Sequence, residues 1–173
     1  WLLFPRVWLH NSVMVMAMVS LAAVFGRFLS PWTGMALLLV LAVYDLLAVR
    51  FGFMLWLASR LSHSNAMPAF VFPRHDLGWN AGMNEAAFDH AAKEEKGERK
   101  FSILGGGDIA FPLLLSASAY FALGLTPALW IAFSGLVGLL AAYAIQMTML
   151  KGKPMPALPP IAAACLIALL IVA

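Results

Sequence analysis

The chain has 173 residues, of which 63% are hydrophobic and only 11% are charged, and its mean hydropathy is +0.89. This composition lies far outside that of soluble domains and predicts an integral, multi-pass membrane protein. The formal net charge is only +3 and most charges fall outside the apolar stretches, so we expect no nucleic-acid partner. The single cysteine, Cys165, excludes an intrachain disulfide and a paired-cysteine metal or redox site.

Five apolar stretches approach the roughly 20 residues that a helix needs to cross a bilayer. They cover residues 7–28, 32–51, 103–124, 128–150 and 156–173. Prolines and glycines mark the short connections between neighbouring stretches, which implies antiparallel helices. We therefore predict an all-α, polytopic membrane protein with five transmembrane helices. Because the chain opens on Trp1 and stops within an apolar stretch, we expect a fragment or a processed chain.

A polar segment divides the chain into three regions. Residues 1–58 hold the first two predicted helices, residues 59–100 form a hydrophilic loop, and residues 101–173 hold the other three helices. The loop contains six of the eight acidic residues and six of the eleven basic ones, which indicates an aqueous environment. We expect this loop to be partly disordered.

Two short segments near the loop have their own patterns. Residues 53–61 favour either an amphipathic helix at the membrane surface or an extension of the preceding helix. Further on, Phe70, Val71 and Phe72 have high β-propensity and lie between two prolines. This second segment predicts a short edge strand.

The basic residues predict the orientation of the chain in the membrane. Ten of the eleven fall on the face that holds the long loop, and Arg27 alone falls on the other face. Basic residues near the ends of spanning helices favour the cytoplasmic side. We therefore expect the loop between the second and third helices to be cytoplasmic.

Two acids, Asp45 and Asp108, remain within the apolar stretches, where an unpaired carboxylate costs several kcal/mol. Asp45 lies five residues before Arg50, and Asp108 lies eight residues after Lys100. At 1.5 Å per residue both acids lie roughly 8–12 Å inside the same face, so they can meet. Two carboxyls that share a site hold one proton between them, which allows one to activate a water while the other protonates a carbonyl. This pair predicts aspartic-protease chemistry.

The residues beside each acid are compatible with a site. Gly105, Gly106 and Gly107 directly precede the second acid and permit a close helix contact or the approach of a ligand to the backbone. Tyr44 precedes the first acid and is either an interfacial aromatic residue or a hydrogen-bonding wall of the site.

Three prolines occur where the last helix should begin, in the sequence Pro156, Ala157, Leu158, Pro159 and Pro160. Prolines at these positions require an extended or kinked backbone. Irregular backbone within a membrane is tolerated where it lines a cavity, so we expect this segment to shape the site.

The chain resembles the presenilin and signal peptide peptidase family of intramembrane aspartyl proteases in three motifs. These are Tyr44-Asp45, Gly105-Gly106-Gly107-Asp108 and Pro156-Ala157-Leu158, in the order and on the helices that the family uses. The residues that follow Asp45 and Asp108 are similar to the archaeal or prokaryotic presenilin-like branch. The resemblance covers nearly the whole chain from the second predicted helix onward.

The resemblance implies a nine-helix fold, of which the five predicted helices correspond to helices five to nine. It implies that Asp45 and Asp108 are the catalytic pair and that Pro156, Ala157 and Leu158 contact substrate. The expected partners are transmembrane peptide or protein substrates, the lipid bilayer and the preceding helices of the same protein. We expect no metal and no cofactor. An unwound substrate would add as a strand to a protein edge, for which Phe70 to Phe72 and the segment before Leu158 are candidates.

Two other functions remain open from the residues alone. A prepilin-peptidase-like protease also uses a GxGD aspartate, although it has no use for the Pro156 segment. A proton-coupled transporter subunit would use paired intramembrane acids as a proton relay. A scaffold without activity that binds membrane partners is a third possibility. The lone His10 in the first helix is more consistent with a helix contact or an interfacial position than with a metal ligand.

Overall fold

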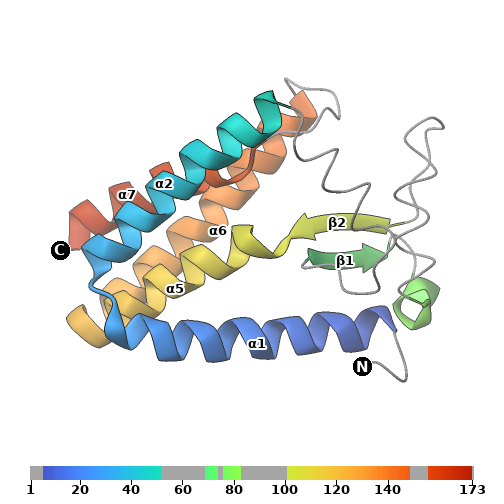
Figure 1. Cartoon of the computed structure of the whole chain (residues 1–173), viewed down its shortest axis with the longest axis horizontal. Helices are drawn as coiled ribbons and strands as arrows, with labels where there is room; N and C mark the ends of the chain where they lie inside the picture. The colour runs from blue at the N-terminus through green and yellow to red at the C-terminus, as the bar shows by residue number, and fades with distance from the viewer. Residues whose placement is uncertain (1–5, 52–68, 74–75, 83–100, 149–155, 173) are drawn as a thin grey trace. The chain divides into compact units, whose positions relative to one another are not determined.

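A computed structural model describes residues 6–51, 69–73, 76–82, 101–148 and 156–172 (Figure 1). Its elements in chain order are α1 (Val7–Phe28), α2 (Pro31–Arg50), β1 (Ala69–Pro73), a 3₁₀ helix η1 (Asp76–Asn80), β2 (Phe101–Gly105), α5 (Gly106–Leu123), α6 (Leu125–Thr148) and α7 (Leu158–Val172).

Four of these helices, α1, α2, α5 and α6, are long and apolar enough to cross a membrane. The fifth, α7, has 15 residues and is shorter than the predicted stretch over residues 156–173, because the prolines delay its start until Leu158. Many large apolar side chains on the helices are exposed in the isolated chain, which is the arrangement expected where lipid covers them. The prediction of an all-α, polytopic membrane protein is confirmed.

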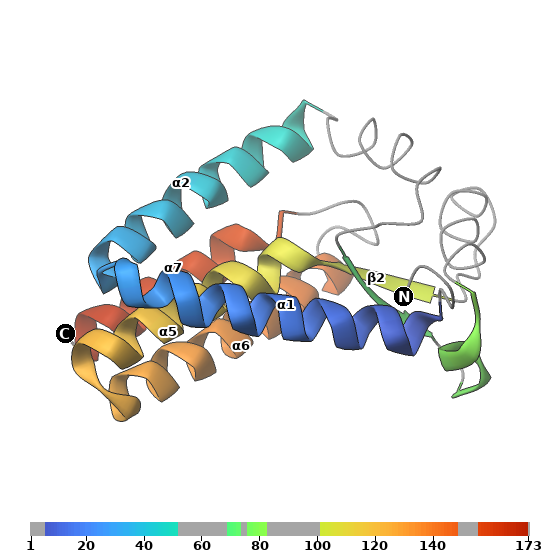
Figure 2. The ribbon, with the colours of Figure 1, turned by 60° about the horizontal axis from the view of Figure 1, so that its bottom comes forward.

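Residues 18–52 and 108–173 form one compact unit, in which α7 packs against both α2 and α6 (Figure 1 and Figure 2). Its core is a continuous apolar cluster that includes Leu38, Leu115, Ile131 and Ile161, all almost fully buried. Glycines let helices approach closely, and at Gly138 the backbone of α7 is the nearest neighbour.

Buried hydroxyl groups in this unit bond to backbone carbonyls. Ser116 donates to the carbonyl of Ala128 at 2.8 Å, and Ser118 donates to the carbonyl of Leu29 beyond the end of α1. The Leu29 carbonyl lies just past the end of α1, where carbonyls have no donor within the helix, so Ser118 supplies one; Ser116 gives the Ala128 carbonyl in the first turn of α6 an additional donor.

Residues 1–17 and 53–107 form the second compact unit, which contains a two-stranded antiparallel sheet. Ala69 pairs with Gly105 and Pro73 pairs with Phe101 at the two ends of the ladder. The two arrows in Figure 1 run in opposite directions. A small core of Val7, Val71 and Phe101 lies against the sheet. The first turn of α1 is also tied to this unit, since Val7 N–H donates to the carbonyl of Ala81 at 3.2 Å.

The strand prediction for Phe70 to Phe72 is confirmed, but the start of the third helix is wrong. Residues 103–105 belong to β2, and α5 begins only at Gly106. Ile103 and Leu104 are apolar and the glycines after them lead into an apolar helix, so hydropathy alone does not separate strand from helix. The predicted amphipathic segment at residues 53–61 and most of the hydrophilic loop lie outside the described residues.

Candidate active site

Asp45 lies on the buried face of α2. The residues that share this face, Met35, Leu38 and Ala42, recur at intervals of three and four positions and pack into the core of the helical unit. Asp45 continues the same stripe and is only 5% exposed. Its carboxyl is therefore held inside the helical unit by the packing of α2.

The backbone at the start of α7 binds this carboxyl. The N–H of Leu158 donates to Asp45 Oδ2 at 3.2 Å, and the backbone of Ala157 interacts with the same group. Prolines have no N–H, so in the segment from Pro156 to Pro160 only Ala157 and Leu158 can donate. A helix N-terminus needs acceptors for its first N–H groups and attracts negative charge. Asp45 supplies such an acceptor, and this bond offsets part of the cost of burying its carboxyl.

Asp108 lies in the first turn of α5 and is half-buried. Its carboxyl is close enough to that of Asp45 for the two to interact electrostatically. Within the described part of the chain, Asp108 has no side-chain hydrogen-bond partner, unlike Asp45. Pro112 lies four residues later and removes the N–H that would bond the carbonyl of Asp108 in a regular helix. The carboxyl of Asp108 therefore has free acceptor capacity in the described part of the chain.

The three glycines form the junction between a strand and a helix. Gly105 is the last residue of β2, while Gly106 and Gly107 open α5. Asp108 thus follows the end of β2 by three residues along the chain.

Tyr44 lies on another face of α2 from Asp45. Consecutive residues in a helix point about 100° apart, so Tyr44 does not share the buried face with Asp45. Its side chain is 56% exposed. The structure does not bring it onto the buried face with the acid. This position agrees with an interfacial aromatic residue rather than with a wall of the site.

Two polar residues of α1 bond to β1, and the sequence alone did not predict these bonds. Asn11 exchanges two hydrogen bonds with the backbone of Val71, and His10 Nε2 lies 3.0 Å from the carbonyl of Ala69. This bond joins His10 to a strand, and the prediction of a helix contact or an interfacial position for His10 stays a prediction. The polar run His10-Asn11-Ser12 in an apolar helix was the available signal, but its partners lie about 60 residues away.

These bonds occupy the outer edge of β1. The prediction that Phe70 to Phe72 offers an open edge to a substrate strand is therefore wrong. The second candidate edge, before Leu158, has no strand at Pro156 or Ala157, and residues 149–155 lie outside the described chain.

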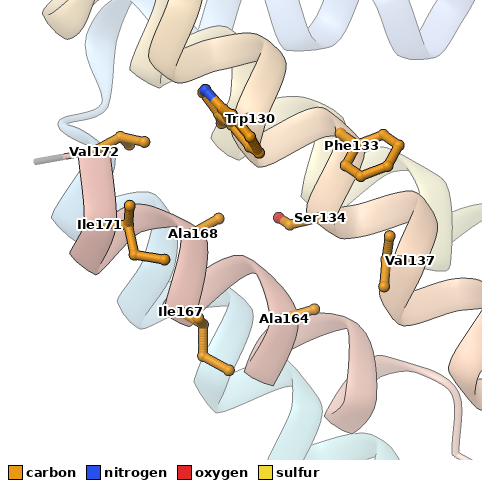
Figure 3. Close-up of a pocket in the computed structure, with 9 residues that line it drawn as sticks. All are labelled: Trp130, Phe133, Ser134, Val137, Ala164, Ile167, Ala168, Ile171 and Val172. Carbon is orange, nitrogen blue, oxygen red and sulfur yellow. The ribbon is translucent and has the colours of Figure 1, made fainter.

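A groove of about 450 Å³ lies between α6 and α7 and contains neither acid (Figure 3). Trp130, Phe133 and Val137 line it from α6, and Ile167 and Ile171 line it from α7. Its lining is almost entirely apolar, so it offers no chemistry for hydrolysis. Among the described residues, no group of three or more His, Cys, Asp or Glu side chains is placed to hold a metal ion.

The comparison with known families decides among the functions that the residues left open. Residues 2–173 match the model of the family described as signal-peptide peptidase, presenilin aspartyl protease. The chain belongs to this family. No curated protein and no solved structure gives a significant match. Membership in the signal-peptide peptidase and presenilin family supports an aspartyl protease in the membrane rather than a transporter subunit or a prepilin-peptidase-like enzyme.

Proposed function

We propose that this protein is an endopeptidase that hydrolyses peptide bonds within transmembrane helices of membrane-protein substrates, with Asp45 and Asp108 as its catalytic residues. The observation that carries the proposal is that these two acids, on different spanning helices, lie close enough to interact electrostatically. Family membership supports the reaction class. The excess of basic residues beside the loop supports a cytoplasmic position for residues 59–100.

The two carboxyls differ in their hydrogen bonds, and this difference supports different roles for them in the reaction. Asp45 Oδ2 is fixed by the Leu158 N–H, whereas Asp108 has acceptor capacity for a water. With one proton shared by the pair, the ionised carboxyl takes a proton from the water while the oxygen of that water attacks the peptide carbonyl carbon. The protonated carboxyl gives its proton to the carbonyl oxygen, which forms a neutral gem-diol. The C–N bond then breaks as a proton passes to the leaving nitrogen.

The outer edge of β2 is the candidate site for an unwound substrate. Antiparallel strands alternate residues that bond to the partner strand with residues whose N–H and C=O point away. Val71 bonds outward to Asn11, so its ladder partner Ile103 also points its backbone groups outward, on the other side of the sheet. Phe101 has the same orientation, two residues earlier. A substrate strand that binds there would lie along the segment that leads into Asp108.

The test is the cleavage of a fluorogenic transmembrane peptide by the purified protein in liposomes. We expect Asp45→Asn and Asp108→Asn each to lower kcat/KM by at least about 100-fold, because each removes one partner of the acid–base pair. Asp76→Asn is the matched control, since it makes the same chemical change outside the spanning helices. Cleavage that survives either intramembrane substitution would refute the proposal.

A further inference from the structure

Asn11 is bonded to β1 in the way that a neighbouring strand would be. Its Nδ2 donates to the carbonyl of Val71 at 2.7 Å, and the N–H of Val71 donates to its Oδ1 at 3.1 Å. One side-chain amide thus satisfies both backbone groups of one strand residue. Val71 is fully buried, so these groups have no access to water in the described structure.

Two further backbone positions on the outer edge of β1 cannot pair freely with another strand. Ala69, Val71 and Pro73 alternate with Phe70 and Phe72, so their backbone groups share the side that faces away from β2. His10 Nε2 takes the carbonyl of Ala69 at 3.0 Å. Pro73 has no N–H to offer. Neither Val71 nor Pro73 therefore presents a free N–H to another strand.

A strand edge with unpaired N–H and C=O groups can pair with any extended peptide near it. With these β1 groups occupied, addition of a strand to β2 is favoured, and the chain of β2 continues through three residues to Asp108. The same two bonds also fix β1 to a spanning helix. An isolated two-stranded sheet is marginally stable, so a sheet fixed in this way is ordered before a substrate arrives.

We propose that Asn11 is a positioning residue for substrate binding: it closes the outer edge of β1 and holds the sheet ordered so that a substrate strand adds at β2. This inference rests on the proposed proteolytic function, because it concerns the sheet edge that the substrate joins. Asn11 itself touches neither the substrate nor the two acids. Its effect on the reaction passes through Val71 and the ladder to β2.

The test replaces Asn11 with leucine, which has nearly the same shape and no polar group. Ser12→Ala is the matched control, because the Ser12 hydroxyl bonds only to the carbonyl of Trp8 in the same helix. Loss of two hydrogen bonds should raise KM for the fluorogenic transmembrane peptide roughly 5- to 30-fold. At saturating peptide, kcat should stay within about twofold, since bound substrate itself reorders the sheet. Asn11→Gln, which keeps the amide, should recover part of the affinity.

Hydrogen exchange supplies a readout that does not depend on cleavage. In Asn11→Leu the amide of Val71 should exchange at least about tenfold faster than in the unaltered protein, whereas Ser12→Ala should leave it unchanged. The amides of Phe70 and Phe72 bond to β2 and serve as the reference within the same peptide.

The outcomes separate the two proposals. Three results in Asn11→Leu would each overturn this inference: unchanged exchange at Val71, an unchanged KM, or a fall in kcat at constant KM. In each case, cleavage by the unaltered protein would still uphold the proposed function. Absence of aspartate-dependent cleavage in the unaltered protein would overturn the proposed function and this inference with it. A raised KM together with faster exchange at Val71 would support both.

Discussion

Helices α6 and α7 approach closely at Gly138, and a methyl group added at this position should disturb both stability and catalysis. A Cβ at this position would lie 2.6 Å from the Cα of Ile161, 3.0 Å from the carbonyl oxygen of Pro160 and 3.2 Å from the Cβ of Ala164. Ordinary contacts between carbon atoms are about 3.5 to 4.0 Å. The distance from the added Cβ to the Cα of Ile161 is therefore about 1 Å shorter than an ordinary contact. This Cα belongs to the backbone of α7, which cannot rotate away as a side chain can.

The size of the effect follows from two opposing terms. Overpacking against backbone costs about 3 kcal/mol, the upper part of the usual range. Alanine is favoured over glycine in a helix by about 1 kcal/mol, which offsets part of this cost. We expect Gly138→Ala to lower the free energy of unfolding by about 2 kcal/mol. Gly135→Ala on the same helix meets Pro112 at 3.2 Å and Cys165 at 3.6 Å, so its clash is about 0.3 Å and the two terms should nearly cancel.

The assay is unfolding of each variant in mixed micelles, monitored by circular dichroism as a denaturing detergent is added. The rate of cleavage of the fluorogenic peptide should also fall, and by more than a loss of folded protein alone would cause. The reason is that Ile161 is three residues from Leu158, whose N–H binds Asp45. A shift of about 1 Å in α7 can cost about 100-fold in rate. Equal stability and equal activity of Gly138→Ala and Gly135→Ala would refute this account of the helix contact.

Three further predictions concern the acids and the cysteine. Asp45→Asn keeps an oxygen for the Leu158 N–H whereas Asp45→Leu leaves that donor unsatisfied, so the leucine variant should be less stable by about 1–3 kcal/mol in the same unfolding assay; equal stabilities would contradict the bond. The dependence of kcat/KM on pH should be bell-shaped, because activity requires one proton on the pair and is lost when both carboxyls are protonated or both are ionised; a rate that rises continuously with pH would argue against a shared proton. Cys165 is fully buried, so it should resist maleimide in the folded protein and react after denaturation, as followed by mass spectrometry; rapid labelling of the folded protein would show that the α6–α7 contact opens.

Local patterns in the sequence were sufficient to predict the spanning helices. The first was predicted at residues 7–28, which are the residues of α1, and α5 and α6 each fall largely within a predicted stretch. Hydropathy works here because each helix satisfies its own backbone hydrogen bonds and needs only apolar side chains toward lipid. It failed at residues 103–105, since β2 depends on pairing with a strand about 30 residues away, and an apolar run alone does not reveal that partner.

The candidate site was predictable in its residues but not in its bonds. Depth along two helices was enough to suggest that Asp45 and Asp108 meet, an expectation that their electrostatic contact supports. The bond from Leu158 to Asp45 joins residues 113 positions apart, and it follows from the packing of α7 against α2. In the same way Asn11 was visible as a polar residue in an apolar helix, while its strand partner was not. Pairing between distant segments is decided by the packed structure, and a single sequence does not report it.

Asp108 differs from the buried polar residues of the helical unit, and this difference leads to a last prediction. Ser116, Ser118 and Asp45 are each bonded to a backbone group. In the described part of the chain, the carboxyl of Asp108 has no such bond and lies near another acid. A polar group without a partner in apolar surroundings opposes folding, and a neighbouring carboxyl adds to that cost.

Asp108→Leu should therefore leave the unfolding transition unchanged or raise its midpoint, while cleavage is abolished. Asp45→Leu should abolish cleavage as well, but with a loss of stability, because it removes the acceptor for Leu158. Unfolding and cleavage measured on the same two preparations distinguish these outcomes. If Asp108→Leu were destabilised as much as Asp45→Leu, Asp108 would have a structural partner, and its retention in an apolar helix would need no catalytic reason.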